Sequence, residues 1–319
     1  MRLSRKQKEE FYRAIYDILF RIPRAKIYEI ARMLQIDRNA ASNRLYEAFN
    51  RAYISKPQIR RRIYANMKEY SYFLQCENPS EFFSECLQNE NIIYHAVMTG
   101  FANLWVLSNK ELDFDCDVVA SGLRSDYHVS YAPNHSWRTA VQIMREKVQN
   151  FNLKDYEPEK VIQNHWNETI EWDKEDEILF KEFNYDFRRP ITPIIRKNLI
   201  SWGKLEKWMQ KLSKSCTIIT HYYPKRISAY DPYLFVFKTD YEDFLINLFS
   251  ELPTSSLSFK VSDKLCIYAY VKREFARIVE TQSNIKELHI PTLAAELRRK
   301  GIIQKEAHSI VECYWNEDP

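Results

Sequence analysis

The chain has 319 residues, of which 45% are hydrophobic and 28% charged, so it has enough apolar material for two or more packed domains. It contains only four glycines, too few for the GxGxxG or GxxxxGK[ST] loops, which excludes the nucleotide-dependent enzymes that use them. The six cysteines are far apart and include no CxxC pair. This spacing predicts reduced thiols and no metal site.

Two segments bear on cellular location. Residues 1–6 are basic and lead into a charged amphipathic segment, without the apolar core or cleavage site of a signal peptide. Residues 91–109 carry no charge, but they include His95, Gly100 and Asn103, whose polar groups would lack partners in lipid. We therefore expect a cytoplasmic protein with no membrane partner, in which 91–109 forms two buried strands around a turn.

Positive charge is concentrated at the N-terminal end. Residues 1–62 hold 16 Lys and Arg against 6 Asp and Glu, a balance of +10, so the total of +4 leaves 4 − 10 = −6 for the remainder. A basic domain attached to a mildly acidic body is typical of proteins that bind nucleic acid.

The basic segment has the pattern of a helix-turn-helix. Apolar residues at helical spacing predict a first helix over 5–21 and a short second helix over 27–34. Asp37 is placed to cap a third helix that begins near Arg38. The basic run 56–63 follows this helix, and it predicts an extended hairpin in the position of a wing.

The period of the apolar residues changes to two after the wing, which predicts an α/β domain. The predicted elements are a strand over 70–76, a helix opening at 78, strands over 92–98 and 101–107, a strand over 127–131 and a helix over 136–148. Their order fits the βαββαβ arrangement of a ferredoxin-like sandwich, except for the placement of its second helix.

The pattern then repeats. Residues 20–23, Phe-Arg-Ile-Pro, match residues 187–190, Phe-Arg-Arg-Pro, at an offset of 167, and the strands downstream align at an offset of 163. In this alignment the second helix-turn-helix has Pro193 in its second helix and Trp202-Gly203 in its turn. Residues 171–226 hold 12 basic and 8 acidic residues, a balance of only +4, so we expect this copy to be degenerate.

The predicted fold class is α/β (α+β), a tandem repeat of a winged helix-turn-helix followed by a ferredoxin-like domain. The predicted boundaries are 1–64 for the first winged helix-turn-helix, 65–150 for the first ferredoxin-like domain, 151–170 for a linker, 171–227 for the second winged helix-turn-helix and 228–319 for the second ferredoxin-like domain.

Residues 30–45 resemble the helix-turn-helix of the Lrp/AsnC family of transcription regulators. In that family an Ile-Ala-x-x-Leu helix, here Ile30-Ala31-Arg32-Met33-Leu34, precedes a short turn and a recognition helix. The resemblance covers about 1–110 and, in outline, 172–275. It implies sequence-specific binding of double-stranded DNA, self-association through the ferredoxin-like domains and, in some members, a small-molecule effector. We therefore expect 65–150 and 228–319 to pack on each other, within one chain or between two.

Candidate DNA contacts follow from the predicted third helix. With Ile36, Ala41, Leu45 and Ala48 turned to the core, an exposed face remains near the helix N-terminus, where recognition helices contact base edges. The candidate base-reading residues are Arg38, Asn39, Ser42 and Asn43. The candidate phosphate contacts are Arg44, Arg51, Lys56, Arg60, Arg61 and Arg62.

An effector, if one binds, is expected at the turn formed by Thr99, Gly100 and Phe101, because a glycine there allows close approach of the backbone. The corresponding turn of the second copy, Ser262-Asp263, lacks this glycine. No catalytic residue, metal or cofactor is predicted.

Two alternatives remain open. Siroheme decarboxylases resemble paired Lrp/AsnC-like units that no longer bind DNA, and His95 with Asn103-Leu104-Trp105 is similar to a short stretch of those enzymes. This resemblance implies a tetrapyrrole substrate, whose propionates would also need basic residues. The other alternative is a protein-interaction scaffold that binds neither DNA nor tetrapyrrole.

Overall fold

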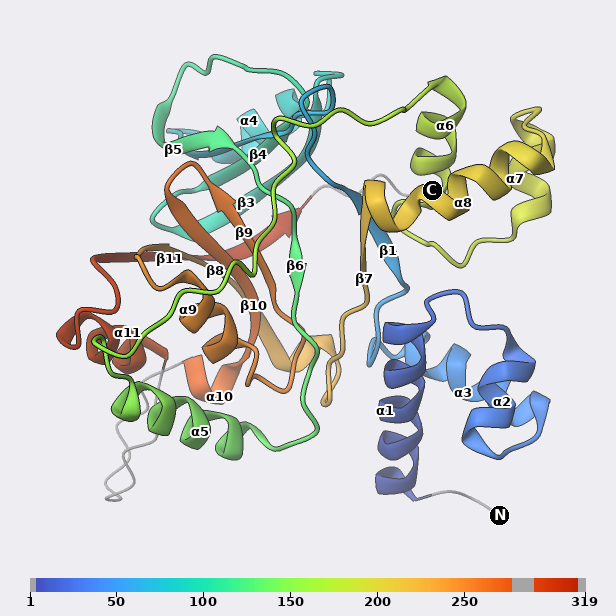
Figure 1. Cartoon of the computed structure of the whole chain (residues 1–319), viewed down its shortest axis with the longest axis horizontal. Helices are drawn as coiled ribbons and strands as arrows, with labels where there is room; N and C mark the ends of the chain where they lie inside the picture. The colour runs from blue at the N-terminus through green and yellow to red at the C-terminus, as the bar shows by residue number, and fades with distance from the viewer. Residues whose placement is uncertain (1–3, 277–289, 315–319) are drawn as a thin grey trace. The chain divides into compact units, whose positions relative to one another are not determined.

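The computed structural model describes residues 4–276 and 290–314, which form a mixed α/β fold of helices and a large antiparallel sheet (Figure 1). The α+β class expected from the sequence is confirmed. The chain divides into two compact units, and each is made of two separate segments. Of the described residues, the helix-turn-helix unit comprises those up to Arg62 together with Ile170–Ser228, and the sheet unit comprises Ile63–Thr169 together with those from Ala229 to Tyr314.

The first helix-turn-helix has the predicted elements. They are α1 (Arg5–Arg21), α2 (Ile27–Leu34) and α3 (Arg38–Asn50). Gln35 ends α2 with a left-handed φ of 55°, and the Asp37 side chain accepts a hydrogen bond of 2.8 Å from the backbone N–H of Ala40 at the start of α3. Local capping therefore fixes the turn between the two helices.

The second helix-turn-helix corresponds to the first at an offset of 164, and the predicted offset of 167 is wrong. Its helices are α6 (Lys174–Phe183), α7 (Ile191–Lys197) and α8 (Trp202–Ser215). The starts of α2 and α7 give 191 − 27 = 164, and those of α3 and α8 give 202 − 38 = 164. Leu199, at 35 + 164, has the same φ of 55° as Gln35. Trp202 and Gly203 therefore open the third helix, and the turn lies before them.

Arg24 and Arg188, which are equivalent at this offset, hold the two copies together. Arg24 donates to the backbone carbonyls of Phe187 and Arg189, the latter at 3.1 Å. Arg188 donates to the carbonyls of Pro23 and Ala25, both at 2.8 Å. Each guanidinium thus bonds the two carbonyls that flank its counterpart. Reciprocal contacts of this kind define a pseudo-twofold pair, the relation that two subunits have in a symmetric dimer. We call these four bonds the arginine clasp.

The predicted wing is not a hairpin. Strand β1 (Gln58–Arg61) pairs antiparallel with β7 (Cys216–Ile219) of the second copy, in the register Gln58 to Ile219. The pairing continues where the N–H of Ser55 donates to His221 and that of Tyr223 to Tyr53. The wing prediction was wrong because the partner of this strand lies in the other repeat, between 216 − 61 = 155 and 219 − 58 = 161 residues away.

The sheet unit contains the remaining elements. Its first half has β2 (Tyr70–Gln75), α4 (Pro79–Cys86), β3 (Ile92–Gly100), β4 (Leu104–Ser108), β5 (Asp117–Leu123), β6 (His128–Val129) and α5 (Trp137–Asn150). Its second half has η1 (Ile227–Ala229), which begins in the last residues of the helix-turn-helix unit, then β8 (Tyr230–Lys238), α9 (Glu242–Phe249), β9 (Leu257–Val261), β10 (Lys264–Lys272), α10 (Arg273–Ala276), α11 (Ile290–Arg299) and β11 (Lys305–Tyr314).

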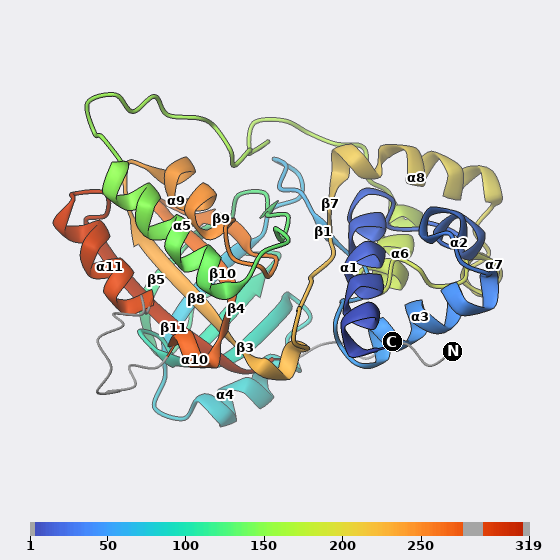
Figure 2. The same ribbon diagram turned by 90° about the horizontal axis from the view of Figure 1, so that it is seen from below.

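Among residues 4–276 and 290–314, nine strands form one antiparallel sheet in the order β5-β2-β4-β3-β11-β8-β10-β9-β6. The second half, β11-β8-β10-β9 with α9 and α11, has the predicted ferredoxin-like order. The first half has the same strand order, but no helix separates β4 from β5 among the described residues, and the predicted strand at 127–131 is the short β6, which pairs with β9. Helix α5 instead lies beside α9 and α11, against the second half (Figure 2).

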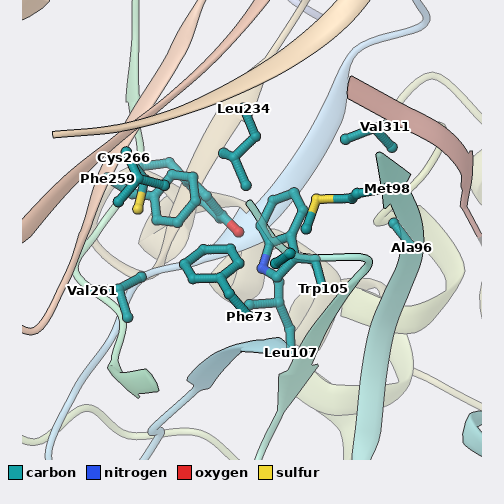
Figure 3. Close-up of a cluster of buried hydrophobic side chains, with 13 residues drawn as sticks. Phe73, Ala96, Met98, Trp105, Leu107, Leu234, Phe259, Val261, Cys266 and Val311 are labelled. Atoms are coloured by element: carbon teal, nitrogen blue, oxygen red, sulfur yellow. The ribbon is translucent and has the colours of Figure 1, made fainter. Parts of the chain in front are cut away.

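The two halves enclose a shared core. Strands β3 and β11 join them at one side, and a single bridge from Arg124 to Val261 joins the end of β5 to β9 at the other. Across the interior, Trp105 of β4 stacks on Phe259 of β9 with ring centroids 5.7 Å apart, among apolar side chains from both halves (Figure 3). The expectation that 65–150 and 228–319 pack on each other is confirmed within one chain.

Gly100 makes the β3–β11 junction possible. A Cβ at this position would lie 2.3 Å from the backbone oxygen of His308, and the φ of +150° is one that glycine favours. We expect Gly100→Ala to lower the free energy of unfolding by roughly 2–4 kcal/mol, because it adds both a backbone clash and conformational strain. Urea unfolding of the full chain measures this change.

The matched control is Gly203→Ala. Gly203 is in α8 and has no atom within 4 Å of the added Cβ, so alanine there is expected to raise helix stability by up to about 1 kcal/mol. Equal stability of the two alanine variants would show that the junction has room for a side chain.

Candidate nucleic-acid interface

The predicted base-reading residues lie together on the surface of α3. Ala41, Leu45 and Ala48 face the core of the helix-turn-helix unit, and this leaves the other side of the helix in solvent. All four candidates are exposed, and we call them the α3 face: Arg38, Asn39, Ser42 and Asn43. Within the described part of the chain, Arg38 makes no ion pair. Arginine and asparagine side chains in solvent near a helix N-terminus are suited to bidentate hydrogen bonds with guanine and adenine.

The equivalent positions of α8 have a different chemistry. At the offset of 164 they are Trp202, Gly203, Glu206 and Lys207, all exposed, and we call them the α8 face. The indole N–H of Trp202 donates to Glu206 Oε1 at 2.7 Å. A carboxylate directed outward repels phosphate, and a glycine offers no side chain to a base. The two faces of the pseudo-twofold pair are therefore unlike.

Two candidate phosphate contacts, Arg44 and Arg51, share an acidic partner. Arg44 pairs with Glu47 at 2.9 Å, Arg51 pairs with the other oxygen of Glu47 at 3.2 Å, and Lys8 of α1 lies 2.8 Å from that carboxylate. Burial alone would raise the pKa of Glu47, but hydrogen bonds from Lys8, Tyr12 and Arg44 lower it to about 2. Glu47 is thus ionised at neutral pH, and it offsets part of the positive charge beside the α3 face.

The candidates of the predicted wing are held by the second copy. Lys56 pairs with Asp186 at 2.7 Å, and Arg61 pairs with Glu177 at 3.0 Å. The guanidinium of Arg60 donates to the carbonyls of Ile59 and Asn184 at 2.9 and 3.0 Å. Arg62 is half-buried, and its backbone N–H donates to Ser215. Substitution of these residues would therefore perturb the contact between the two copies as well as any contact with phosphate.

Two exposed side chains of the first helix-turn-helix, one on α3 and one on α2, were not predicted. Tyr46 is 70% exposed and lies one turn after Ser42, so it extends the same side of α3. Arg32 is exposed on α2 and, among the described residues, has no ion pair. An aromatic residue four positions after a polar one in a predicted recognition helix was the signal that would have identified Tyr46.

The predicted effector turn is hydrogen-bonded to strand β11 of the same sheet. Gly100 is the last residue of β3 and pairs with Ser309 of β11, and the N–H of Phe101 donates to His308. Thr99 Oγ1 donates to Glu312 at 2.5 Å. The close backbone approach that Gly100 allows is thus made by β11. Effector binding at Thr99, Gly100 and Phe101 stays a prediction.

The residues that resemble siroheme decarboxylases do not converge on one site. His95 is buried against Phe83 of α4, with ring centroids 4.3 Å apart, and burial lowers its pKa to about 4. The amide of Asn103 bonds the backbone of Cys76, and Trp105 lies in the shared core, where its N–H donates to Ser71 at 3.0 Å. Each side chain has a structural contact, and His95 and Trp105 face opposite sides of the sheet.

Comparisons with known proteins give a likeness of fold. No protein-family model matches the chain, and a search of curated proteins found no match. Among solved structures, the crystal structure of the siroheme decarboxylase NirDL is similar, with 11% identity and a TM-score of 0.46 over 94% of this chain and 91% of that one. The same enzyme in co-complex with an iron-uroporphyrin III analogue gives 10% identity and a TM-score of 0.44 over the same shares. A likeness this distant supports no inference about activity.

Of the helices in residues 4–276 and 290–314, none has the length and apolar character needed to cross a membrane.

Proposed function

We propose that this chain is a sequence-specific DNA-binding transcription regulator that contacts base edges through the α3 face. The observation that carries the proposal is the exposure of Arg38, Asn39, Ser42 and Asn43 on one side of the third helix of a helix-turn-helix. These side chain types form the hydrogen bonds that distinguish base pairs in the major groove.

Electrostatics supports the same assignment. Residues 1–62 carry 16 basic and 6 acidic side chains. Some of these charges are neutralised by ion pairs, but Arg32 of α2 and Arg38 of the α3 face are exposed and have no ion pair among the described residues. Attraction to phosphate supplies most of the non-specific affinity of such proteins, and the base contacts add specificity.

The test begins with selection of bound fragments from random duplexes, followed by titration of the selected duplex. We expect Arg38→Ala or Asn43→Ala to weaken binding to that duplex by about 1–3 kcal/mol, or roughly 5–150-fold. Binding to random duplex is expected to change by less than about twofold, because a base contact adds discrimination and little non-specific affinity. Fluorescence anisotropy at fixed salt measures both.

Lys207→Ala is the matched control, because Lys207 occupies the position in α8 that Asn43 occupies in α3. It is expected to affect the selected duplex less than Asn43→Ala does. A purified protein without salt-sensitive affinity for any duplex would refute the proposal. In that case a change in the absorbance of an added iron tetrapyrrole would favour the decarboxylase alternative, and no change would favour the scaffold.

A further inference from the structure

Cys76 and Cys116 face each other at one end of the sheet. Strands β2 and β5 are antiparallel and pair Gln75 with Asp117, so the next opposed positions are 76 and 116. The two Sγ atoms are 2.8 Å apart. Cys76 is buried, whereas Cys116 is partly exposed and so accessible to a reagent in solution.

Asn103 fixes the geometry of this pair. Its Oδ1 accepts from the N–H of Cys76 at 2.9 Å, and its Nδ2 donates to the carbonyl of Cys76 at 2.7 Å. Because both backbone groups of Cys76 are bonded to Asn103, Cys76 and Cys116 form a pair without cross-strand hydrogen bonds. Such opposed residues have Cα atoms about 4.5 Å apart in antiparallel sheets, which lies within the range that disulfides span.

We propose that Cys76 and Cys116 are a reversible oxidation site that forms an intramolecular disulfide by exchange with a low-molecular-weight disulfide. In the first step, the Cys116 thiolate attacks one sulfur of the reagent, whose S–S bond breaks and releases one thiolate. In the second, the Cys76 thiol gives its proton to that thiolate and attacks Cys116 Sγ, which releases the second thiolate. This thiolate takes up from water the proton that Cys116 lost when it ionised. Two electrons pass from the protein to the reagent, which is reduced to two thiols.

The difference in burial between the two thiols determines which of them reacts first. Burial raises the pKa of Cys76 to about 12, and that of Cys86 nearby also to about 12. Both are therefore protonated thiols at neutral pH and poor initial nucleophiles. Cys116 is the more exposed thiol and reacts first, after which Cys76 is already in place to attack it.

The experiment uses the full chain equilibrated with oxidised glutathione, followed by alkylation of the remaining thiols and mass spectrometry of peptides. We expect one Cys76–Cys116 linkage, reversed by reduced glutathione. Oxidation is expected to raise the melting temperature by about 5 °C, because the linkage constrains an intervening segment of about 40 residues in the unfolded chain.

Cys116→Ser is expected to abolish both the linkage and the thermal shift, whereas Cys86→Ser should leave both unchanged. The Cys86 variant matters because Cys86 is another thiol near the pair and, like Cys76, is buried. A glutathione adduct that persists on Cys116 while Cys76 can still be alkylated would overturn the proposal, as would a linkage that includes Cys86. Neither result depends on DNA binding.

Discussion

Replacing Arg124 by alanine is expected to lower the free energy of unfolding by about 3–5 kcal/mol, because it removes the guanidinium that neutralises the buried carboxylate of Glu69. Arg124 is fully buried, and both its Nε, at 3.1 Å, and its Nη2 donate to Glu69 Oε2. Its Nη1 donates to the carbonyl of Ser125 at 2.6 Å, and the guanidinium lies 3.9 Å from the ring centroid of Tyr127. Urea unfolding followed by tryptophan fluorescence measures the loss.

The double variant Arg124→Met with Glu69→Leu separates this cause from a general loss of packing. It removes both charges together, so we expect it to recover most of the stability lost in Arg124→Ala. Arg5→Ala is a surface control, since Arg5 pairs with Glu9 while its side chain is 80% exposed, and a change below about 0.5 kcal/mol is expected. A double variant as unstable as the single one would show that loss of the positive partner of Glu69 is not the cause.

The sequence predicted the first helix-turn-helix well because local interactions determine it. Apolar spacing defines α1 and α2, and the Asp37 cap sets the start of α3, so each boundary depends on residues within one helical turn. The exposure of the α3 face follows from the same periodicity. These features need no knowledge of distant contacts.

The prediction of a wing was wrong because the structure of this segment depends on distant contacts. A basic run such as 56–63 looks like a solvent-exposed phosphate-binding hairpin when its charges are counted alone. In the structure, β1 pairs with β7, and Asp186 and Glu177 of the second copy neutralise Lys56 and Arg61. Composition gives the number of charges, and only the tertiary structure gives their partners.

The repeat illustrates how identical residues can mislead an alignment. Matching Phe-Arg-x-Pro placed Arg188 opposite Arg21, whereas the structure makes Arg188 the counterpart of Arg24 in the arginine clasp. The true offset became visible through backbone conformation, since Gln35 and Leu199 share a left-handed turn that their side chains do not indicate. The hydrogen bonds that each arginine donates to two carbonyls of the other copy therefore determine the alignment of the repeats better than the surrounding Phe-Arg-x-Pro motif does.

The arginine clasp has a consequence for DNA binding if the proposed function holds. Helices related by a twofold axis contact inverted repeats, and each half-site is bound by one helix. Here the α3 face is polar and basic, while the α8 face carries Trp202, Gly203 and Glu206. A pseudo-symmetric unit with one competent face should therefore prefer a single half-site.

Grafting the α3 face onto α8 should change this preference from one half-site to two inverted half-sites. We expect the variant with Trp202→Arg, Gly203→Asn, Glu206→Ser and Lys207→Asn to bind a duplex with two inverted copies of the selected half-site at least about tenfold more tightly than a duplex with one copy. The second contact becomes intramolecular once the first helix is bound, which increases affinity without a new partner. The wild-type chain is expected to distinguish the two duplexes by no more than about twofold, which reflects the doubled number of sites.

The measurement is a titration of both duplexes at constant salt, with the half-site centres placed about 10 or 11 base pairs apart so that both lie on one face of the DNA. The grafted positions avoid the ion pairs of the helix-turn-helix unit, since Lys204 and Lys211, which pair with Asp176, are unchanged. Adding Arg38→Ala to the graft should remove the tighter binding of the two-site duplex, because that complex needs both α3 and α8 to contact bases. If the graft bound both duplexes equally while still binding the single half-site, α8 would be unable to enter the groove, and the pseudo-twofold unit would be a device for stability alone.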